Sequence, residues 1–253
     1  MIRLIRAEER ARPNLRGGKL WSQHLVAPVA RRSTAPHVPL TVTLDEVLLG
    51  GGAPEPEAEP DSVEGITYVF EGGLDPAPPM KAMLAGDFHY RCRRRRGAVP
   101  FALSHAGGRG ARLFRLWFHA GAELRHLPSR LHRVGMANQR DRLCLIASPD
   151  GRRGSLPLRH DVAFFSSSLE QGTHVSHALG AGRFAWIYVV RGGLLLNNIK
   201  LRDGDAATVD ELMGISLLAS TPVELLLVDM GLAPPVRRGE PRQARVLSDR
   251  PSK

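Results

Sequence analysis

The chain has 253 residues, 43% of them hydrophobic, which is enough for one large core or for two cores of about 100 residues each. Its 26 glycines and 19 prolines, with only 6% aromatic residues, predict many short strands joined by turns. The formal charge of +10 comes without a recognition-helix, zinc-finger or RNA-stacking motif, so we do not expect specific nucleic-acid binding. Nonspecific binding through the arginine surplus is the alternative, and its affinity would fall steeply with salt.

The cysteines and the first residues indicate the compartment. Cys92 and Cys144 lie in separate segments without a metal-ligand spacing, which predicts neither a disulfide framework nor a zinc site. Residues 1–10 alternate charged and apolar side chains and lack the apolar run of a signal peptide, and no segment approaches the roughly 18 apolar residues of a membrane span. We therefore expect a cytoplasmic protein with no membrane partner.

The first half of the chain alternates strand patterns with turn residues. Strands are predicted at residues 38–44, 66–70, 88–90 and 113–118, where β-branched and aromatic residues gather. The Gly- and Pro-rich residues 50–60 predict a loop, and residues 85–87 a turn. From 122 to 140 the pattern loosens, which is typical of a crossing between domains.

The second half has the same texture. Strands are predicted at residues 162–169, 184–190, 194–196, 215–219 and 223–229, separated by glycine turns at 170–172, 192–193 and 203–206. Both halves thus predict an all-β fold of two cupin (jelly-roll) β-barrels in tandem. We expect barrels at residues 1–128 and 129–235, followed by a charged, disordered tail at 236–253.

Several motifs in the second half belong together. They are LIASPDGRRGSL at residues 145–156, RHDVAFF at 159–165, GRFAWIYVVRG at 182–192, Asn198, Gly204-Asp205-Ala206 and LLLVD at 225–229. The first half adds residues 1–7, Trp21, 45–47, 67–72, 85–87 and 113–117. Taken together, the sequence resembles the pirin family over about residues 1–230.

The resemblance implies a bicupin fold. Many pirins carry one iron or another divalent metal in the N-terminal barrel, and some have quercetin 2,3-dioxygenase activity, while animal members act as nuclear cofactors of transcription. The family holds its metal with a His-x-His pair and with a His and a Glu on a later strand. Residues two apart on a strand share a face, so such a spacing builds a pocket.

This chain lacks those histidines. The first pair of positions reads Glu57 and Glu59, followed by Glu64, or, counted back from Thr67 without an insertion, Ala58 and Pro60. For the second pair, one alignment gives Pro100 and Ala102 and the other gives Val99 and Phe101. We therefore predict no catalytic residue, no metal and no other cofactor. The former metal pocket would be lined by Glu57, Glu59, Glu64, Val99, Pro100, Phe101 and Ala102.

A run of arginines precedes the second pair of positions. Strand alternation would place Arg91, Arg93 and Arg95 on one face, where they could contact an anion in the former pocket. The alternative is a solvated basic edge that discourages strand pairing. We predict a metal-free binding or regulatory module for a small ligand, such as an anion, or for a protein partner. The alternative function is a quercetinase-type oxygenase with one divalent metal, such as iron, in the N-terminal barrel.

The remaining polar residues suggest no further site. His89 and His105 are interpreted as turn or surface histidines, and Ser166, Ser167 and Ser168 as strand surface. His174 and His177 are three residues apart and would point to opposite faces of a strand, so they do not form a ligand pair. No nucleophile elbow, phosphate-binding loop or dinucleotide fingerprint occurs.

Overall fold

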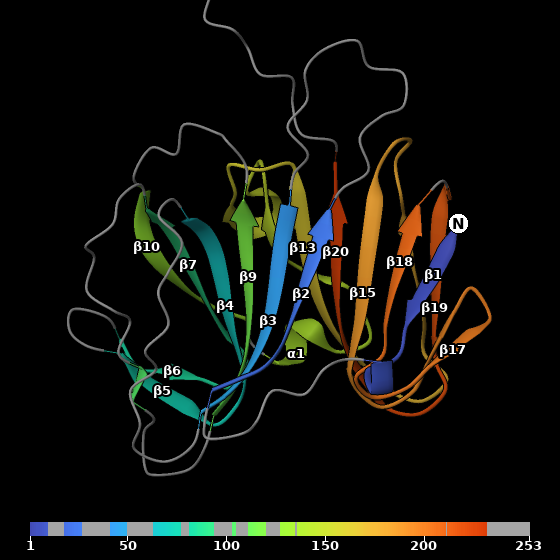
Figure 1. Cartoon of the computed structure of the whole chain (residues 1–253), viewed down its shortest axis with the longest axis horizontal. Coiled ribbons are helices and arrows are strands. Elements are labelled where there is room, and N and C mark those ends of the chain that lie inside the picture. Colours follow the sequence, from blue (N-terminus) through green and yellow to red (C-terminus); the bar gives the residue numbers. More distant parts are fainter. Residues whose placement is uncertain are drawn as a thin grey trace, which may run out of the picture.

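The computed structural model describes residues 1–9, 18–26, 41–49, 63–76, 81–93, 103–104, 111–119, 127–134, 136–210 and 212–231. Most of these residues lie in β-strands, and they form two barrels that lie side by side (Figure 1). The tandem jelly-roll fold predicted from the sequence is confirmed. The predicted loop at 50–60 and the tail at 236–253 lie outside the described residues.

Among the described residues, the first barrel has a six-stranded and a three-stranded sheet. The larger sheet contains, in spatial order, β10 (Leu127–Arg133), β7 (Asp87–Arg93), β4 (Val63–Glu71), β9 (Ala111–His119), β3 (Thr41–Leu49) and β2 (Gly18–Val26). The smaller sheet contains β6 (Met83–Leu84), β5 (Gly73–Pro76) and β8 (Leu103–Ser104). The strand predicted at 38–44 overlaps β3, which extends to Leu49. Asp45 and Glu46 end the apolar pattern of the sequence there, but both are buried and the strand continues through them.

The second barrel pairs a seven-stranded with a four-stranded sheet in the described ranges. The larger sheet runs β1 (Ile2–Ile5), β18 (Ala206–Asp210), β15 (Phe184–Arg191), β20 (Val223–Met230), β13 (Val162–Leu169), β11 (Cys144–Ser148) and β12 (Leu156–Pro157). The smaller sheet runs β14 (His174–Ala178), β19 (Gly214–Ala219), β16 (Leu194–Leu196) and β17 (Ile199–Leu201). Buried aliphatic side chains fill the space between these two sheets.

Two strands differ from the predicted division at residue 128. β1, from the start of the chain, pairs antiparallel with β18 of the second barrel, as Figure 1 shows. β10 crosses the predicted boundary and pairs with β7 of the first barrel. The region 122–140, predicted as an irregular crossing, contains this strand and the short helix α1 (Met136–Gln139), which lies between the barrels (Figure 1). The division of the rest of the chain stays a prediction.

The two large sheets pack against each other through an aromatic core. Tyr68 stacks on Phe88 with ring centroids 4.3 Å apart, and Phe88 meets Phe164 of the second barrel edge-to-face at 6.0 Å. Phe114 and Tyr188 make a similar contact at 5.5 Å. Each such ring buries a large apolar area. The two barrels therefore share an aromatic core, in addition to the core inside each barrel. Short 3-10 turns occur at Ala7–Glu9 and Arg152–Gly154, and no helix within the described residues has the length and apolarity that a membrane crossing requires.

Candidate functional site

The inside of the first barrel is apolar at one end. Val47, Val69 and Leu113 of the large sheet are fully buried against Leu74 and Met83 of the small sheet. Because side chains on a strand alternate between the two faces, every second residue from these positions also faces the interior. Following each strand away from the apolar end therefore identifies the lining of the rest of the barrel.

That lining is polar. In the first row, strand register places Thr67 of β4 opposite Arg115 of β9 on one side and His89 of β7 on the other. Asp45 of β3 is in turn opposite Arg115. All four side chains are buried, and Arg115 is 6% exposed. A carboxylate and a guanidinium are thus cross-strand neighbours inside the barrel, where the low dielectric strengthens their interaction.

The next row lies nearer the strand ends and contains Arg91. Gly65 of β4 is opposite Trp117 of β9 and Arg91 of β7, and Trp117 is opposite Thr43 of β3. Arg91 is only 7% exposed. A Cβ on residue 65 would lie 2.6 Å from Cε3 of Trp117, so the indole lies directly over the glycine backbone. Because residue 65 is a glycine, the indole of Trp117 can lie over β4, the strand that separates β9 from Arg91 of β7.

Burial determines the charge states in these rows. Desolvation, reinforced by the nearby Arg91 cation, lowers the pKa of His89 to about 4, so this imidazole is neutral at pH 7. The indole Nε1 of Trp117 donates a 3.0 Å hydrogen bond to Oδ2 of Asp45. The two described rows thus carry two guanidinium groups and one carboxylate.

Several predicted pocket residues lie outside the described residues, namely Glu57, Glu59, Arg95, Val99, Pro100, Phe101 and Ala102. The backbone of Arg93 belongs to β7, and its side chain is not described. Arg91, by contrast, is buried on the inward face of β7. The hypothesis that arginines contact an anion in the former pocket requires this inward position.

Glu64 does not line the pocket, contrary to the sequence interpretation. It precedes Gly65, so its side chain points out of the barrel and into the contact with the second barrel. Its Oε1 accepts hydrogen bonds of 2.7 Å from the Tyr90 hydroxyl and from the backbone amide of Arg159, and its Oε2 contacts Nδ1 of His160. This fully buried carboxylate links the two barrels.

The described rows do not fit a transition-metal ion. Such an ion needs several converging His, Cys, Asp or Glu ligands, and no group of three or more of these residues occurs in the part of the chain that the structure describes. Asp45 and His89 are separated in their row by Arg115 and Thr67. A divalent cation there would meet two buried guanidinium groups, which would repel it.

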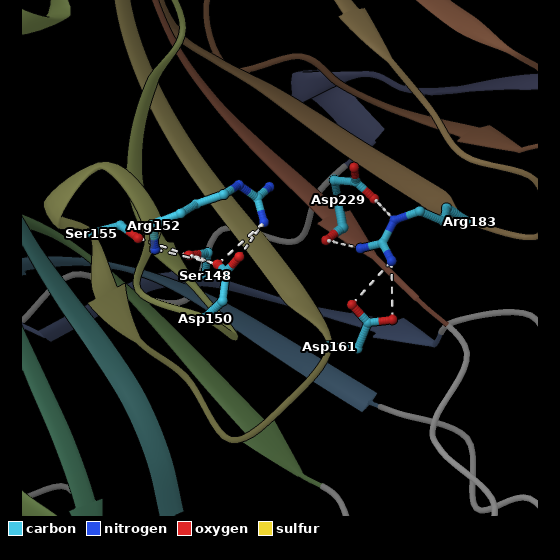
Figure 2. A network of polar contacts seen from close by, with 7 residues as sticks. All are labelled: Ser148, Asp150, Arg152, Ser155, Asp161, Arg183 and Asp229. Carbon is cyan, nitrogen blue, oxygen red and sulfur yellow. Dashed lines mark hydrogen bonds and ion pairs between the residues drawn. The ribbon is translucent and has the colours of Figure 1, made fainter.

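The mouth of the second barrel is filled by an ion-pair network (Figure 2). Nε of Arg183 donates to Oδ1 of Asp229 at 2.6 Å, and NH1 of the same guanidinium lies 3.0 Å from both carboxylate oxygens of Asp161. Nε2 of His177 contacts the other oxygen of Asp229 at 2.8 Å. A Cβ on Gly231 would lie 1.7 Å from Oδ2 of Asp161, so glycine is required there. These contacts tie together the ends of β13, β15 and β20.

A second part of Figure 2 shows the turn after β11. Asp150 accepts a 2.8 Å hydrogen bond from the hydroxyl of Ser148, and it also accepts from the backbone amide of Arg152 at 3.3 Å. The hydroxyls of Ser148 and Ser155 are 2.7 Å apart. Gly151 has a φ of 63°, a left-handed conformation that glycine adopts without strain. The SPDGRRGS motif is thus a self-contained structural turn.

Two other sequence interpretations need correction. His89 is 1% exposed within β7 and not a turn or surface residue, because it faces the barrel interior. Ser166 and Ser167 are buried in β13, where Ser167 donates to the carbonyl of Arg142 at 2.7 Å. His105 lies outside the described residues. The free thiol of Cys144 is half-buried, and desolvation raises its pKa, which lowers its reactivity.

Comparison with known proteins agrees with this architecture. Residues 145–230 match the family model of the quercetinase C-terminal cupin domain. A protein of Escherichia coli (strain K12) named quercetin 2,3-dioxygenase is 26% identical over 242 residues, covering 93% of this chain and all of the relative. A putative quercetin 2,3-dioxygenase of Zymomonas mobilis, ZMO1337, is 28% identical over 67% of this chain and 73% of its own length.

Solved structures show the same fold over almost the whole chain. The bacterial pirin YhhW from Escherichia coli, in complex with nickel(II), has a TM-score of 0.69 at 22% identity and covers 92% of this chain and 100% of its own. The chain has the fold of the bacterial pirins. Escherichia coli YhaK also shares the fold, with a TM-score of 0.64 at 21% identity over 83% of this chain and 94% of its own.

Sequence reasoning found only part of this site. Arg91 was a candidate because strand alternation placed it on the pocket face. Arg115 and His89 were missed, since they stand in otherwise apolar strand patterns and only the register with β4 brings them together. Asp161, Arg183 and Asp229 were recognised as motif residues, but their separation by 22 and 46 positions concealed their contact.

Proposed function

We propose that this pirin-family protein is a metal-free, non-catalytic binding or regulatory module whose first barrel takes a small anion. The carrying observation is the burial of Arg91 and Arg115 on the inward face, with Asp45 as the carboxylate in the same two rows. Guanidinium groups bind carboxylate and phosphate oxygens through paired hydrogen bonds, and their attraction for an anion is strengthened away from water. A cytoplasmic location is part of this proposal.

The size of the anion follows from its surroundings. Trp117 covers the strand beside Arg91, and Thr43 and Thr67 add hydroxyl groups to the same face. A compact oxyanion with several acceptor atoms, such as oxalate or phosphate, suits this combination of cations and hydroxyl donors. The neutral imidazole of His89 can serve as either donor or acceptor there.

A thermal-shift and calorimetric titration tests this proposal. Oxalate and inorganic phosphate, added at constant ionic strength, should raise the melting temperature of the full chain, because a ligand that binds only the folded state stabilises it. Arg91→Met should weaken binding by about tenfold or more, since it removes a buried charge partner. The matched control is Arg130→Met, which removes an exposed arginine of the same barrel.

Two results would refute the anion site. One is the absence of any stabilisation by either anion beyond that of chloride at equal ionic strength. The other is equal affinity in the Arg91→Met and unchanged proteins, which would place the anion elsewhere on this basic surface.

The second candidate is a quercetin 2,3-dioxygenase-type oxygenase, because the relatives carry that name. In this chain the activity would need a divalent metal such as iron in the first barrel. The ligands would have to come from around residues 57–60 and 99–102, and those segments contain no histidine. This lack of strong transition-metal ligands is our reason for preferring the binding module.

A further inference from the structure

A separate cavity lies between the two barrels, at the end where α1 is found. Its volume is about 420 Å³, within the range of roughly 300–1,000 Å³ that small-molecule sites occupy. The walls come from both barrels and from α1: Tyr68 belongs to the first barrel, Ser166 and Ser168 to the second, and Gln139 to the helix. The cavity is lined by none of the inward-facing residues of the first barrel, so it is distinct from the anion site.

The hydrogen-bonding groups of this cavity are held in place. Gln139 is only 5% exposed, and its Oε1 accepts a 2.8 Å hydrogen bond from the hydroxyl of Ser166. Its Nε2 donates to the carbonyl of Val134. The Tyr68 hydroxyl is hydrogen-bonded to Ser166, and burial, followed by the nearby Glu224 carboxylate, raises the pKa of Tyr68 to about 12. The wall therefore presents a fixed amide, hydroxyls and a neutral phenol.

The charges around the cavity are balanced. NH2 of Arg191 lies 2.7 Å from Oε1 of Glu224, and NH2 of Arg140 lies 3.1 Å from Oε1 of Glu170. All four residues line the cavity. A charged ligand would have to give up hydration without a surplus of opposite charge to replace it, whereas an uncharged ligand would not.

We propose that this cavity binds an uncharged, hydroxylated ring compound, with hydroxyl groups on the serine and glutamine wall and a ring near Tyr68 and Phe70. Nucleosides and aryl glycosides share this chemistry. The small side chains of Ala85 and Ala137 leave the space open, and both residues are exposed, so either can be enlarged without disturbing the core.

Saturation-transfer NMR on the full chain tests the proposal with two matched pairs of probes. Adenosine and phenyl β-glucoside are the neutral probes, and adenosine monophosphate and phenyl β-glucuronide are their charged counterparts. At about 10 mM ligand, at least one neutral probe should give a signal, and its charged counterpart should bind about fivefold more weakly or worse. Binding by only one neutral probe would identify the source as nucleoside or glycoside.

Ala137→Trp should abolish the signal by filling the cavity, and Ala82→Trp, an exposed alanine outside it, should leave the signal unchanged. If Ala137→Trp fails to fold, Ala85→Trp narrows the cavity from the first barrel. Silence from both neutral probes, equal binding of the charged probes, or an undiminished signal in the filled variants would overturn the proposal. None of these results depends on the anion site.

Discussion

Arg183 is the residue on which the mouth of the second barrel depends. Its guanidinium is 24% exposed and neutralises Asp229, which is 7% exposed at its side chain. Arg183→Met would leave that buried carboxylate with its contact to His177 but without the guanidinium, at a cost of about 2–4 kcal/mol in the free energy of unfolding. Urea denaturation would measure the loss. Arg202→Met, an exposed control in the same barrel, should change it by less than about 0.5 kcal/mol.

His89 gives the first barrel a pH dependence. The pKa of His89 in the folded protein is about 4, below the 6.5 of an ordinary histidine. Between these two pH values the unfolded chain therefore binds a proton that the folded chain does not. Stability should therefore be complete above about pH 6.5 and fall as the pH drops toward 4, by up to about 3 kcal/mol. The charged groups of the described barrel lining nearest His89 are Arg115 and Asp45 in its own row and Arg91 in the next row.

Urea titrations at pH 7.5, 6 and 5 test the histidine's contribution. His89→Gln cannot take up a proton, so its stability should vary less over this window than that of the unchanged protein. His174→Gln, on the exposed face of β14, should retain the full pH dependence. Identical profiles for His89→Gln and the unchanged protein would show that His89 does not carry the effect.

At the scale of the element, β1 is held in the second barrel by Asp205. The carboxylate accepts a 3.0 Å hydrogen bond from the Ala7 amide and a 2.7 Å hydrogen bond from the Arg6 guanidinium. Burial opposes ionisation of Asp205, but these contacts and the Arg202 amide outweigh it and lower its pKa. Because the folded-state pKa is depressed, this contribution is present above the ordinary aspartate range and is lost as the pH falls through the folded value.

Asp205→Ala should release the start of the chain from the barrel. We expect a loss of about 2 kcal/mol in stability and faster hydrogen exchange at the amides of Ile2–Ile5, because three hydrogen bonds disappear. Glu8→Ala, an exposed change in the same segment, is the control. Unchanged exchange in Asp205→Ala would mean that pairing with β18 alone secures the strand.

The elements show what sequence can and cannot predict. Five strands of the second barrel, β13, β15, β16, β19 and β20, were predicted, because apolar runs such as residues 184–190 end at glycine turns that only a few conformations satisfy. β10 was missed, since Arg130 and Arg133 break its apolar pattern and its pairing with β7 is set by tertiary contact. The pairing of β1 with β18 joins segments about 200 residues apart, and no local pattern specifies such a partner.

Local sequence patterns also predicted only part of the candidate site. Alternation along β7 was enough to place Arg91 on the pocket side. It could not show that Arg115 of β9 belongs to the adjacent row, because that depends on the register of three strands. Glu64 is adjacent to Gly65, which faces the barrel interior, so the side chain of Glu64 faces outward. The sequence did not reveal this, because the alignment before Thr67 was uncertain.

At the scale of the molecule, Glu64 connects the two barrels. Glu64→Ala would leave the Tyr90 hydroxyl, the Arg159 amide and His160 Nδ1 without this acceptor in a buried contact, at a cost of about 3–5 kcal/mol. Differential scanning calorimetry should show a lower and broader transition, as the barrels lose part of their coupling. Glu71→Ala, an exposed site on the same strand, should leave the transition in place.

We propose that the first barrel works without a metal. The direct test is elemental mass spectrometry of protein purified without a histidine tag, after iron, nickel, manganese, copper and zinc have been offered in turn. We predict that every metal stays well below one equivalent per chain. Near-stoichiometric uptake of any of them, abolished by Glu57→Ala with Glu59→Ala, would contradict the claim and make flavonol oxidation the activity to test.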